Sequence, residues 1–122
     1  MQKRRVGQFG EEQACQYLLR HAFLILERNY YTRFGELDII AYDCTYEQLV
    51  FIEVKTRCNS IFGAYSISQK KYHKMKRSAW IYMKRESKIT DDYRFDSITI
   101  NIHKLHKKLH LRHEKAISQY LS

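Results

Sequence analysis

Residues 35–57, with the sequence GELDIIAYDCTYEQLVFIEVKTR, decide the fold. Glu36–Tyr42 and Gln48–Thr56 are rich in Ile, Val and Phe, which are residue types that β-strands favour. The connection between them, residues 43–47, has the length of a turn. We therefore expect an antiparallel hairpin.

The hairpin is expected to bring two carboxylates together. If it turns symmetrically, Asp38 lies opposite Glu53, and Glu36 lies opposite Lys55 on the neighbouring pair of positions. Asp38 and Glu53 stand in apolar sequence, and residues paired across strands are only about 5 Å apart, so their charges repel each other. Two such carboxylates either share a proton or hold a hard cation such as Mg²⁺.

Lys55 adds a cation to this pattern. It follows Glu53 by two residues and points to the same side of the strand, about 6.6 Å farther along. An ammonium group there can orient or help deprotonate a water that attacks a phosphodiester, or stabilise the charge that grows on the phosphate. The same residues can instead form a solvated ladder of surface ion pairs, and the spacing alone favours neither interpretation.

The rest of the chain predicts helices on both sides of this hairpin. The expected elements are a helix over 8–22, a strand over Phe23–Asn29, a helix over 68–86, a strand over Arg94–Ile102 and a closing helix over Leu111–Leu121. Together with the hairpin they predict an α/β fold with a central mixed β-sheet flanked by helices. Since proline, repeats and low-complexity tracts are absent, we expect a single domain over residues 1–122.

The chain is strongly basic, with 22 Lys and Arg against 13 Asp and Glu and a net charge of +9. This charge favours a polyanionic partner, with nucleic acid ahead of an anionic membrane. The alternative is that the charge only keeps the protein soluble. The helix over 68–86 carries no acid before Glu86, which favours contact between its basic face and phosphate. The residues expected to bind nucleic acid are Arg57, Lys70, Lys71, Lys74 and Arg77.

Three features predict a cytoplasmic protein. No stretch approaches the roughly 18 apolar residues of a membrane span. The basic N-terminus is not followed by the apolar core of a signal peptide. Cys15, Cys44 and Cys58 are odd in number and widely spaced, which favours reduced thiols over a disulfide framework or a zinc ribbon.

Two features near the C-terminus have structural interpretations. The four histidines from His103 to His113 are spaced as on one face of a helix, but the Lys and Arg around them oppose metal binding. A basic surface is the better interpretation. Asp96 shares a strand face with Ile98 and Ile100, which indicates a structural ion pair.

Several segments occur together in an order typical of one protein family. They are Gly7–Ala14, Leu26–Asn29, Gly35–Ala41, Val50–Arg57, Phe62-Gly63, Lys71, Ala79 and Arg94–Asp96. Through this ordered set the chain resembles the YraN-like family of small bacterial proteins. That family is placed in the PD-(D/E)XK nuclease superfamily, with similarity to Holliday-junction resolvases.

The resemblance implies a restriction-endonuclease-like (PD-(D/E)XK) core and a Mg²⁺-dependent phosphodiesterase site, with Mn²⁺ as a substitute. It implies that Glu11 completes a metal site whose principal ligands are Asp38 and Glu53. Lys55 would be the catalytic lysine, and Asp38 and Glu53 would be catalytic as well. The resolvase-like relatives suggest a homodimer by analogy.

We therefore expect a Mg²⁺-dependent endonuclease that acts on DNA, structured or branched DNA included, and makes no membrane contact. The main rival is a nucleic-acid-binding module, on DNA, RNA or the ribosome, that keeps the fold without turnover. A basic structural protein is a third possibility, but it leaves the acids in apolar sequence unexplained.

Overall fold

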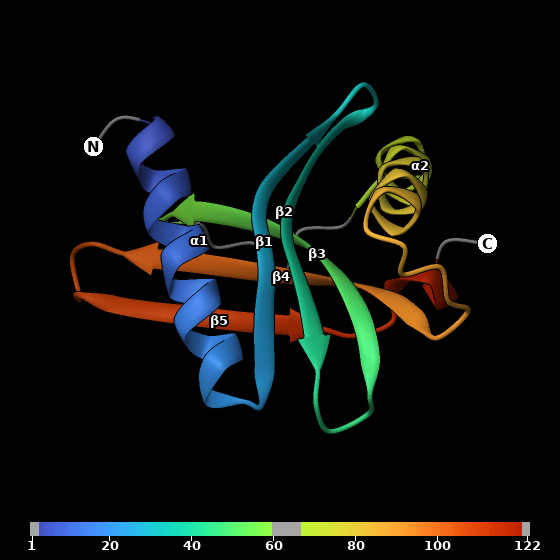
Figure 1. Cartoon of the computed structure of the whole chain (residues 1–122). Coiled ribbons are helices and arrows are strands. Elements are labelled where there is room, and N and C mark those ends of the chain that lie inside the picture. Colours follow the sequence, from blue (N-terminus) through green and yellow to red (C-terminus); the bar gives the residue numbers. More distant parts are fainter. Residues whose placement is uncertain (1–2, 60–66, 121–122) are drawn as a thin grey trace.

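The computed structural model of the protein describes residues 3–59 and 67–120 (Figure 1). In chain order its elements are α1 (Lys3–Arg20), β1 (Phe23–Thr32), β2 (Gly35–Asp43), β3 (Gln48–Cys58), α2 (Gln69–Arg85), β4 (Tyr93–His103), β5 (Lys108–Glu114) and the 3₁₀ helix η1 (Ile117–Tyr120). The sheet is mixed and has five strands in the order β1-β2-β3-β4-β5. The expected α/β fold is confirmed, and it is consistent with a restriction-endonuclease-like core. The Phe62-Gly63 motif lies outside the described residues.

The central strand of the sheet is β3, and it is covered on both faces. It pairs parallel with β4, whereas the other neighbouring strands pair antiparallel. A parallel pair needs a long crossover connection, and α2 lies in the connection from β3 to β4. With α2 on one face and α1 on the other, residues 49–52 of β3 are all buried, which explains their unbroken apolar sequence.

Each helix buries an apolar stripe against its own face of the sheet. On the α1 face the buried residues are Ala14, Cys15, Leu18, Phe23, Ile39, Ala41, Val50, Ile52, Ile98 and Ile100. On the α2 face they are Leu37, Ile40, Leu49, Phe51, Ile67, Tyr72, Met75, Ala79, Tyr82, Met83, Phe95 and Ile117. The outer side of each helix carries mainly polar residues, although the apolar side chains of Phe9, Leu19 and Trp80 are exposed. In the described part of the chain, neither helix combines the length and apolar character needed to cross a bilayer.

The β2–β3 hairpin has the symmetric register that its sequence predicts. Its pairs run from Asp43 with Gln48 to Ile39 with Ile52. The ladder ends there, and the earlier part of β2 follows β1 away from β3, toward the top of Figure 1. The two strands thus form a fork just beyond Ile39 and Ile52.

The predicted closing helix over Leu111–Leu121 is wrong. Residues 108–114 form β5, antiparallel to β4, and only the short η1 follows. Without β5, strand β4 would leave a row of unpaired backbone N–H and C=O groups at the sheet edge, and β5 satisfies them. The histidines therefore share no helical face, because His103 ends β4 while His113 lies in β5 beside Tyr17 of α1.

Asp96 lies in a buried ion-pair network, which confirms its predicted structural role. Its carboxylate accepts hydrogen bonds from Arg94 Nε (3.0 Å) and the Ala116 backbone N–H (2.9 Å), and His113 Nε2 lies 2.8 Å away. Arg94 also pairs with Asp43 at 2.8 Å. Burial alone would raise the pKa of Asp96, but the hydrogen bonds outweigh burial and hold that pKa below its usual range.

Asp96→Asn should lower the free energy of unfolding by about 3–5 kcal/mol, because it leaves the Arg94 guanidinium incompletely compensated in a buried place. The pKa of Asp96 is lowered in the folded state, so its contribution is present above about pH 4 and lost as the pH falls below it. Urea denaturation at neutral and acid pH measures both effects. Asp91→Asn, at an exposed acid, is the control. A variant as stable as wild type would mean that Asp43 and Gln48 satisfy Arg94 by themselves.

Candidate functional site

The candidate site lies in the fork between β2 and β3. Asp38 is the first residue of β2 beyond the paired ladder, and its Oδ2 accepts a hydrogen bond from the Val54 backbone N–H at 2.8 Å. The Asp38 carboxylate thus accepts the hydrogen bond of the Val54 N–H, which has no backbone partner on β2 because the ladder has ended. Glu53 precedes Val54 on β3 and is only 8% exposed. The fork keeps both carboxylates largely away from solvent.

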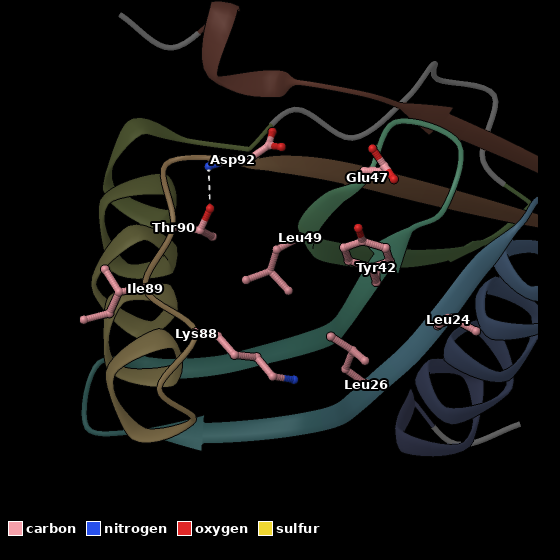
Figure 2. A pocket seen from close by; sticks show the side chains of 9 residues that line it. All are labelled: Leu24, Leu26, Tyr42, Glu47, Leu49, Lys88, Ile89, Thr90 and Asp92. Carbon is pink, nitrogen blue, oxygen red and sulfur yellow. Dashed lines mark hydrogen bonds between the residues drawn. The ribbon is translucent and has the colours of Figure 1, made fainter.

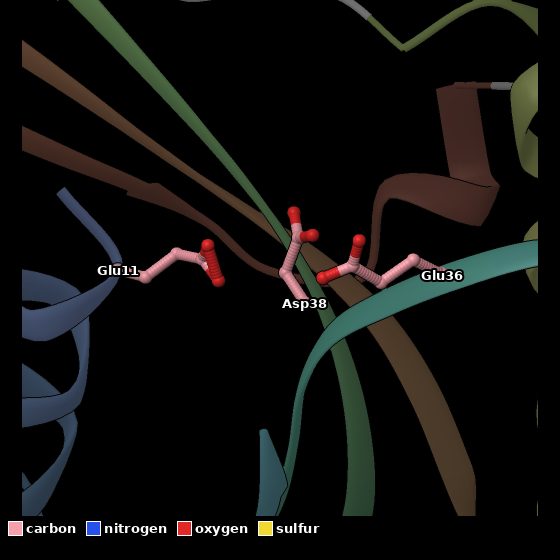
Figure 3. Close-up of side chains that lie close together, drawn as sticks. All are labelled: Glu11, Glu36 and Asp38. Carbon is pink, nitrogen blue, oxygen red and sulfur yellow. The ribbon is translucent and has the colours of Figure 1, made fainter. Parts of the chain in front are cut away.

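Three carboxylates converge at this fork from two elements. Figure 3 shows Glu11 of α1 on one side of Asp38 and Glu36 of β2 on the other, with their carboxylates pointing toward one another. One oxygen from each lies within 4.8 Å of the others, and all three residues are partly buried. The expected strand pairs of Asp38 with Glu53 and of Glu36 with Lys55 are wrong, because Asp38 and Glu36 lie past the end of the β2–β3 ladder. The side chains of Asp38 and Glu53 are nevertheless hydrogen-bonded.

Asn29 of β1 connects two of these carboxylates. Its Nδ2 donates hydrogen bonds of 2.6 Å to Glu11 Oε1 and to Glu36 Oε1. The backbone of Asn29 has a φ of +51°, in the left-handed region that asparagine tolerates better than most residues. One amide group therefore holds together two acids that would otherwise repel each other.

Gly10 allows α1 to carry Glu11 to the sheet. A Cβ at position 10 would overlap the side chain of Thr56 on β3. Only glycine lets the helix approach the strand this closely. Since Glu11 follows directly, this close packing determines how far its carboxylate reaches toward Asp38.

The electrostatics of the fork favour a shared proton when no cation is present. Burial raises the pKa of Asp38 to about 8, and the charge of Glu53 adds to the rise. The pKa of Glu53 is also raised by burial, although Lys71 and a hydrogen bond from Asp38 act against the rise. Burial raises the pKa of Glu11 as well, partly offset by its hydrogen bond from Asn29.

Lys71 of α2 is the cation nearest to Glu53 among the contacts that the structure gives. Its Nζ lies 3.4 Å from Glu53 Oε1. Burial raises the pKa of Glu53 and the Lys71 ammonium group opposes that rise, whereas no ammonium group acts on the pKa of Asp38. In the Asp38–Glu53 pair the proton therefore belongs on Asp38 and the charge on Glu53.

The donor set fits a hard divalent cation. Its candidate ligands, Glu11, Glu36 and Asp38, are carboxylates, with Glu53 hydrogen-bonded to Asp38. Mg²⁺ prefers oxygen ligands and keeps several coordination positions for water and phosphate oxygens. This group contains no histidine or cysteine, the ligands that zinc or copper would favour. Binding a cation here would relieve the repulsion that raises these pKa values.

The site that the sequence predicts is brought together in part. Glu11, Asp38 and Glu53 gather at the fork, and Lys55 is an exposed residue of β3, two residues after Glu53 and opposite Thr99 of β4. Sequence reasoning missed three contributors, namely Glu36 as a member of the acidic group, Asn29 as its connector and Lys71 as the partner of Glu53. Asn29 could have been found from the sequence, because it ends Leu26–Asn29, one of the segments that carry the family resemblance.

The residues predicted to bind nucleic acid divide into two groups. Lys70, Lys74 and Arg77 are exposed on α2, as a phosphate-binding face requires. Lys74 lines a small cavity of about 140 Å³ together with Glu36 and Lys71, so the basic face of α2 adjoins the acidic group. Lys71 belongs to the site itself, and Arg57 is partly buried near the end of β3.

A larger cavity lies elsewhere and has a different character. Figure 2 shows it near the opposite end of β2. Its volume is about 520 Å³, and its lining residues are Leu24, Leu26, Tyr42, Glu47, Leu49, Lys88, Ile89, Thr90 and Asp92. Most of its exposed lining is apolar, and it contains no member of the acidic group. Although it is larger, this cavity is therefore not the candidate functional site.

A family model described as "Uncharacterised protein family UPF0102" matches residues 10–100. The chain belongs to the UPF0102 family. The resemblance to the YraN-like family is thereby confirmed. The match includes Glu11, the β2–β3 hairpin and α2, and it ends before β5.

Curated UPF0102 proteins match over most of their own length. The UPF0102 protein of Syntrophomonas wolfei is 37% identical over 99 residues, which cover 80% of this chain and 84% of the relative. That of Dictyoglomus turgidum is 39% identical over 102 residues, with 82% and 85% covered. That of Desulforamulus reducens is 35% identical over 118 residues, with 94% and 96% covered.

The metal-free protein should become less stable as the pH rises from about 4 to about 8. The pKa of Asp38 is raised in the folded state, so its contribution is fully present below the unfolded pKa, near 3.9, and lost by about pH 8. The slope is at most about 1.4 kcal/mol per pH unit for one group. Asp38→Asn should flatten this part of the profile, since the amide cannot ionise. Urea denaturation in EDTA across this range measures the difference.

The same measurement tests the fit to a cation. At pH 8, Mn²⁺ should stabilise wild type and leave Asp38→Asn nearly unchanged, because a ligand that binds only the folded state raises its stability. Identical pH profiles for the two proteins, together with no response to Mn²⁺, would show that Asp38 is neither titrating nor a ligand.

Proposed function

We propose that this UPF0102 protein is a Mg²⁺-dependent endonuclease that hydrolyses phosphodiester bonds in DNA, structured or branched DNA included. One observation carries the proposal. The fork between β2 and β3 holds Asp38 against buried Glu53, and two further carboxylates, Glu11 and Glu36, converge on Asp38. A protein that only binds nucleic acid through its surface would have no use for carboxylates that repel one another in this way.

The acids would hold the cation while the chain handles the proton and the substrate. Glu11, Glu36 and Asp38 would be its ligands, and the charged Glu53 would stabilise it from the neighbouring position. A bound Mg²⁺ polarises a phosphodiester and lowers the pKa of a coordinated water. Loss of the Asp38 proton would accompany binding, since ligating carboxylates must be ionised.

Lys55 is the proposed catalytic lysine. It is exposed, and its place on β3 puts it about 6.6 Å along the strand from Glu53, on the same side. From there its ammonium group would orient the attacking water and stabilise negative charge on the phosphate in the transition state. Lys71 has a separate role, because its contact with Glu53 favours the ionised form of that acid.

The basic face of α2 would hold the substrate beside the acids. Lys70, Lys74 and Arg77 are exposed there, and α2 has no acid between Gln69 and Arg85. Cations in such an array bind the phosphate backbone without regard to sequence. The resemblance of the motifs to PD-(D/E)XK nucleases supports the same chemistry.

Lys55→Ala should reduce the single-turnover rate of cleavage by about 10²- to 10⁴-fold and leave binding of uncleaved substrate nearly intact, because the role of Lys55 is at the transition state. Lys55→Arg should restore little, since a guanidinium is larger and does not give up a proton. Cleavage and binding should be measured on one branched DNA with Mn²⁺. The exposed Lys88→Ala, in the loop after α2, is the matched control.

Two results would contradict this assignment. Equal losses of binding and cleavage in Lys55→Ala would make Lys55 a phosphate contact. Binding of branched, duplex and single-stranded substrates by the wild-type protein, with no cleavage of any of them in Mg²⁺ or Mn²⁺, would identify a non-catalytic binding module.

Lys74→Ala should weaken nucleic-acid binding to a similar degree for all sequences and reduce the slope of log affinity against log salt by about 1, because one phosphate contact is lost. Titrations of labelled DNA at several salt concentrations measure the slope. Lys88→Ala should leave the slope unchanged. An affinity that does not respond to salt in wild type would remove the electrostatic basis of the proposal.

A further inference from the structure

A solvent-exposed tryptophan lies on α2 beside the β1–β2 turn. Trp80 is 49% exposed, an unusual position for the largest apolar side chain. It lines a cavity of about 390 Å³ together with Arg33 and Phe34 of the turn and with Lys76, Arg77 and Ile81 of α2. The cavity is open to solvent, and its walls are mostly apolar and include two aromatic rings.

The charge on this cavity is uniformly positive. Three of its six lining residues are cations and none is an acid. Two of the cations, Arg33 and Arg77, place their guanidinium carbons 5.0 Å and 5.2 Å from the centroid of the Phe34 ring. A second copy of this face would bring these cations against one another. A ligand that is both aromatic and anionic complements them.

We propose that this cavity binds an unstacked nucleobase in a single-stranded stretch of nucleic acid, with the base on the face of Trp80 and its flanking phosphates at Arg33 and Arg77. Stacking on an exposed aromatic ring within a positively charged groove is how proteins hold single strands without sequence preference. A base inside a duplex already stacks on both neighbours and offers no face to the ring. The inference rests on the proposed function in taking nucleic acid as the partner.

The cavity adjoins the candidate site. Phe34 also lines the smaller cavity that contains Glu36, Lys71 and Lys74, so the two cavities share one lining residue. Along α2, Trp80 follows Lys74 by six residues, which corresponds to about 9 Å. A strand that runs along α2 from the acids would pass Lys74 and reach Trp80. The substrate class is then a junction between duplex and single strand, with its unpaired bases on the Trp80 side.

The experiment uses the fluorescence of Trp80, which is the only tryptophan in the chain. The wild-type protein, in EDTA so that nothing is cleaved, should show quenched tryptophan emission on titration with single-stranded oligodeoxythymidylate, and little change with a duplex of equal length. In parallel, the affinity for labelled single strand should fall by about 5-fold to 150-fold in Trp80→Ala. Trp80→Phe should retain most of the affinity, because its ring still stacks.

Ile89→Ala is the matched control, since Ile89 is an exposed apolar residue outside this cavity. Unchanged emission at saturating oligonucleotide, or equal quenching by duplex, would overturn the proposal. Self-association that Trp80→Ala abolishes would overturn it too, because the cavity would then be a contact between copies. Failure of the nuclease proposal is distinguishable, because it removes cleavage and leaves metal-free quenching in place.

Discussion

Repulsion among carboxylates is the constraint on which the rest of this structure depends. Glu11, Glu36 and Asp38 hold one oxygen each within 4.8 Å of the others, where like charges oppose folding. The chain offsets that repulsion with groups from other elements, the amide of Asn29 on β1 and the ammonium of Lys71 on α2. Since α1, β1, β2, β3 and α2 all contribute, the site requires the complete arrangement of helices and sheet.

The sheet contains two kinds of buried acid, and their partners distinguish them. Asp96 is compensated by a guanidinium, an imidazole and a backbone N–H, so its pKa is lowered and its charge is stable in the folded state. Asp38 is largely buried, has one backbone donor and faces Glu53, so burial and the charge of Glu53 raise its pKa. The first arrangement ties β5 and the segment after it to β4. The second arrangement leaves the carboxylates at the fork incompletely compensated and shifts their pKa values, which is characteristic of functional sites.

Helix α2 connects the core to the proposed substrate surface. One side of it buries Tyr72, Met75 and Tyr82 against the sheet, while the other side presents cations without an acid. Lys71 lies where the two sides meet and contacts Glu53. In this protein, packing the helix against the sheet therefore also positions basic groups beside the acids.

Local sequence determined the elements whose pattern is complete within a few residues. The strands of the hairpin, its register from Asp43 to Ile39 and the apolar stripe of α2 follow from side-chain periodicity and turn length, which need no knowledge of the neighbours. It also indicated that Asp38 and Glu53 would come together. Only the tertiary structure decided that residues 108–114 are a strand, because the exposed edge of β4 outweighed a helical pattern. It alone brought Glu36, Asn29 and Lys71 to the acids, since their contacts depend on where β2 leaves β3 and on how closely α1 and α2 approach the sheet.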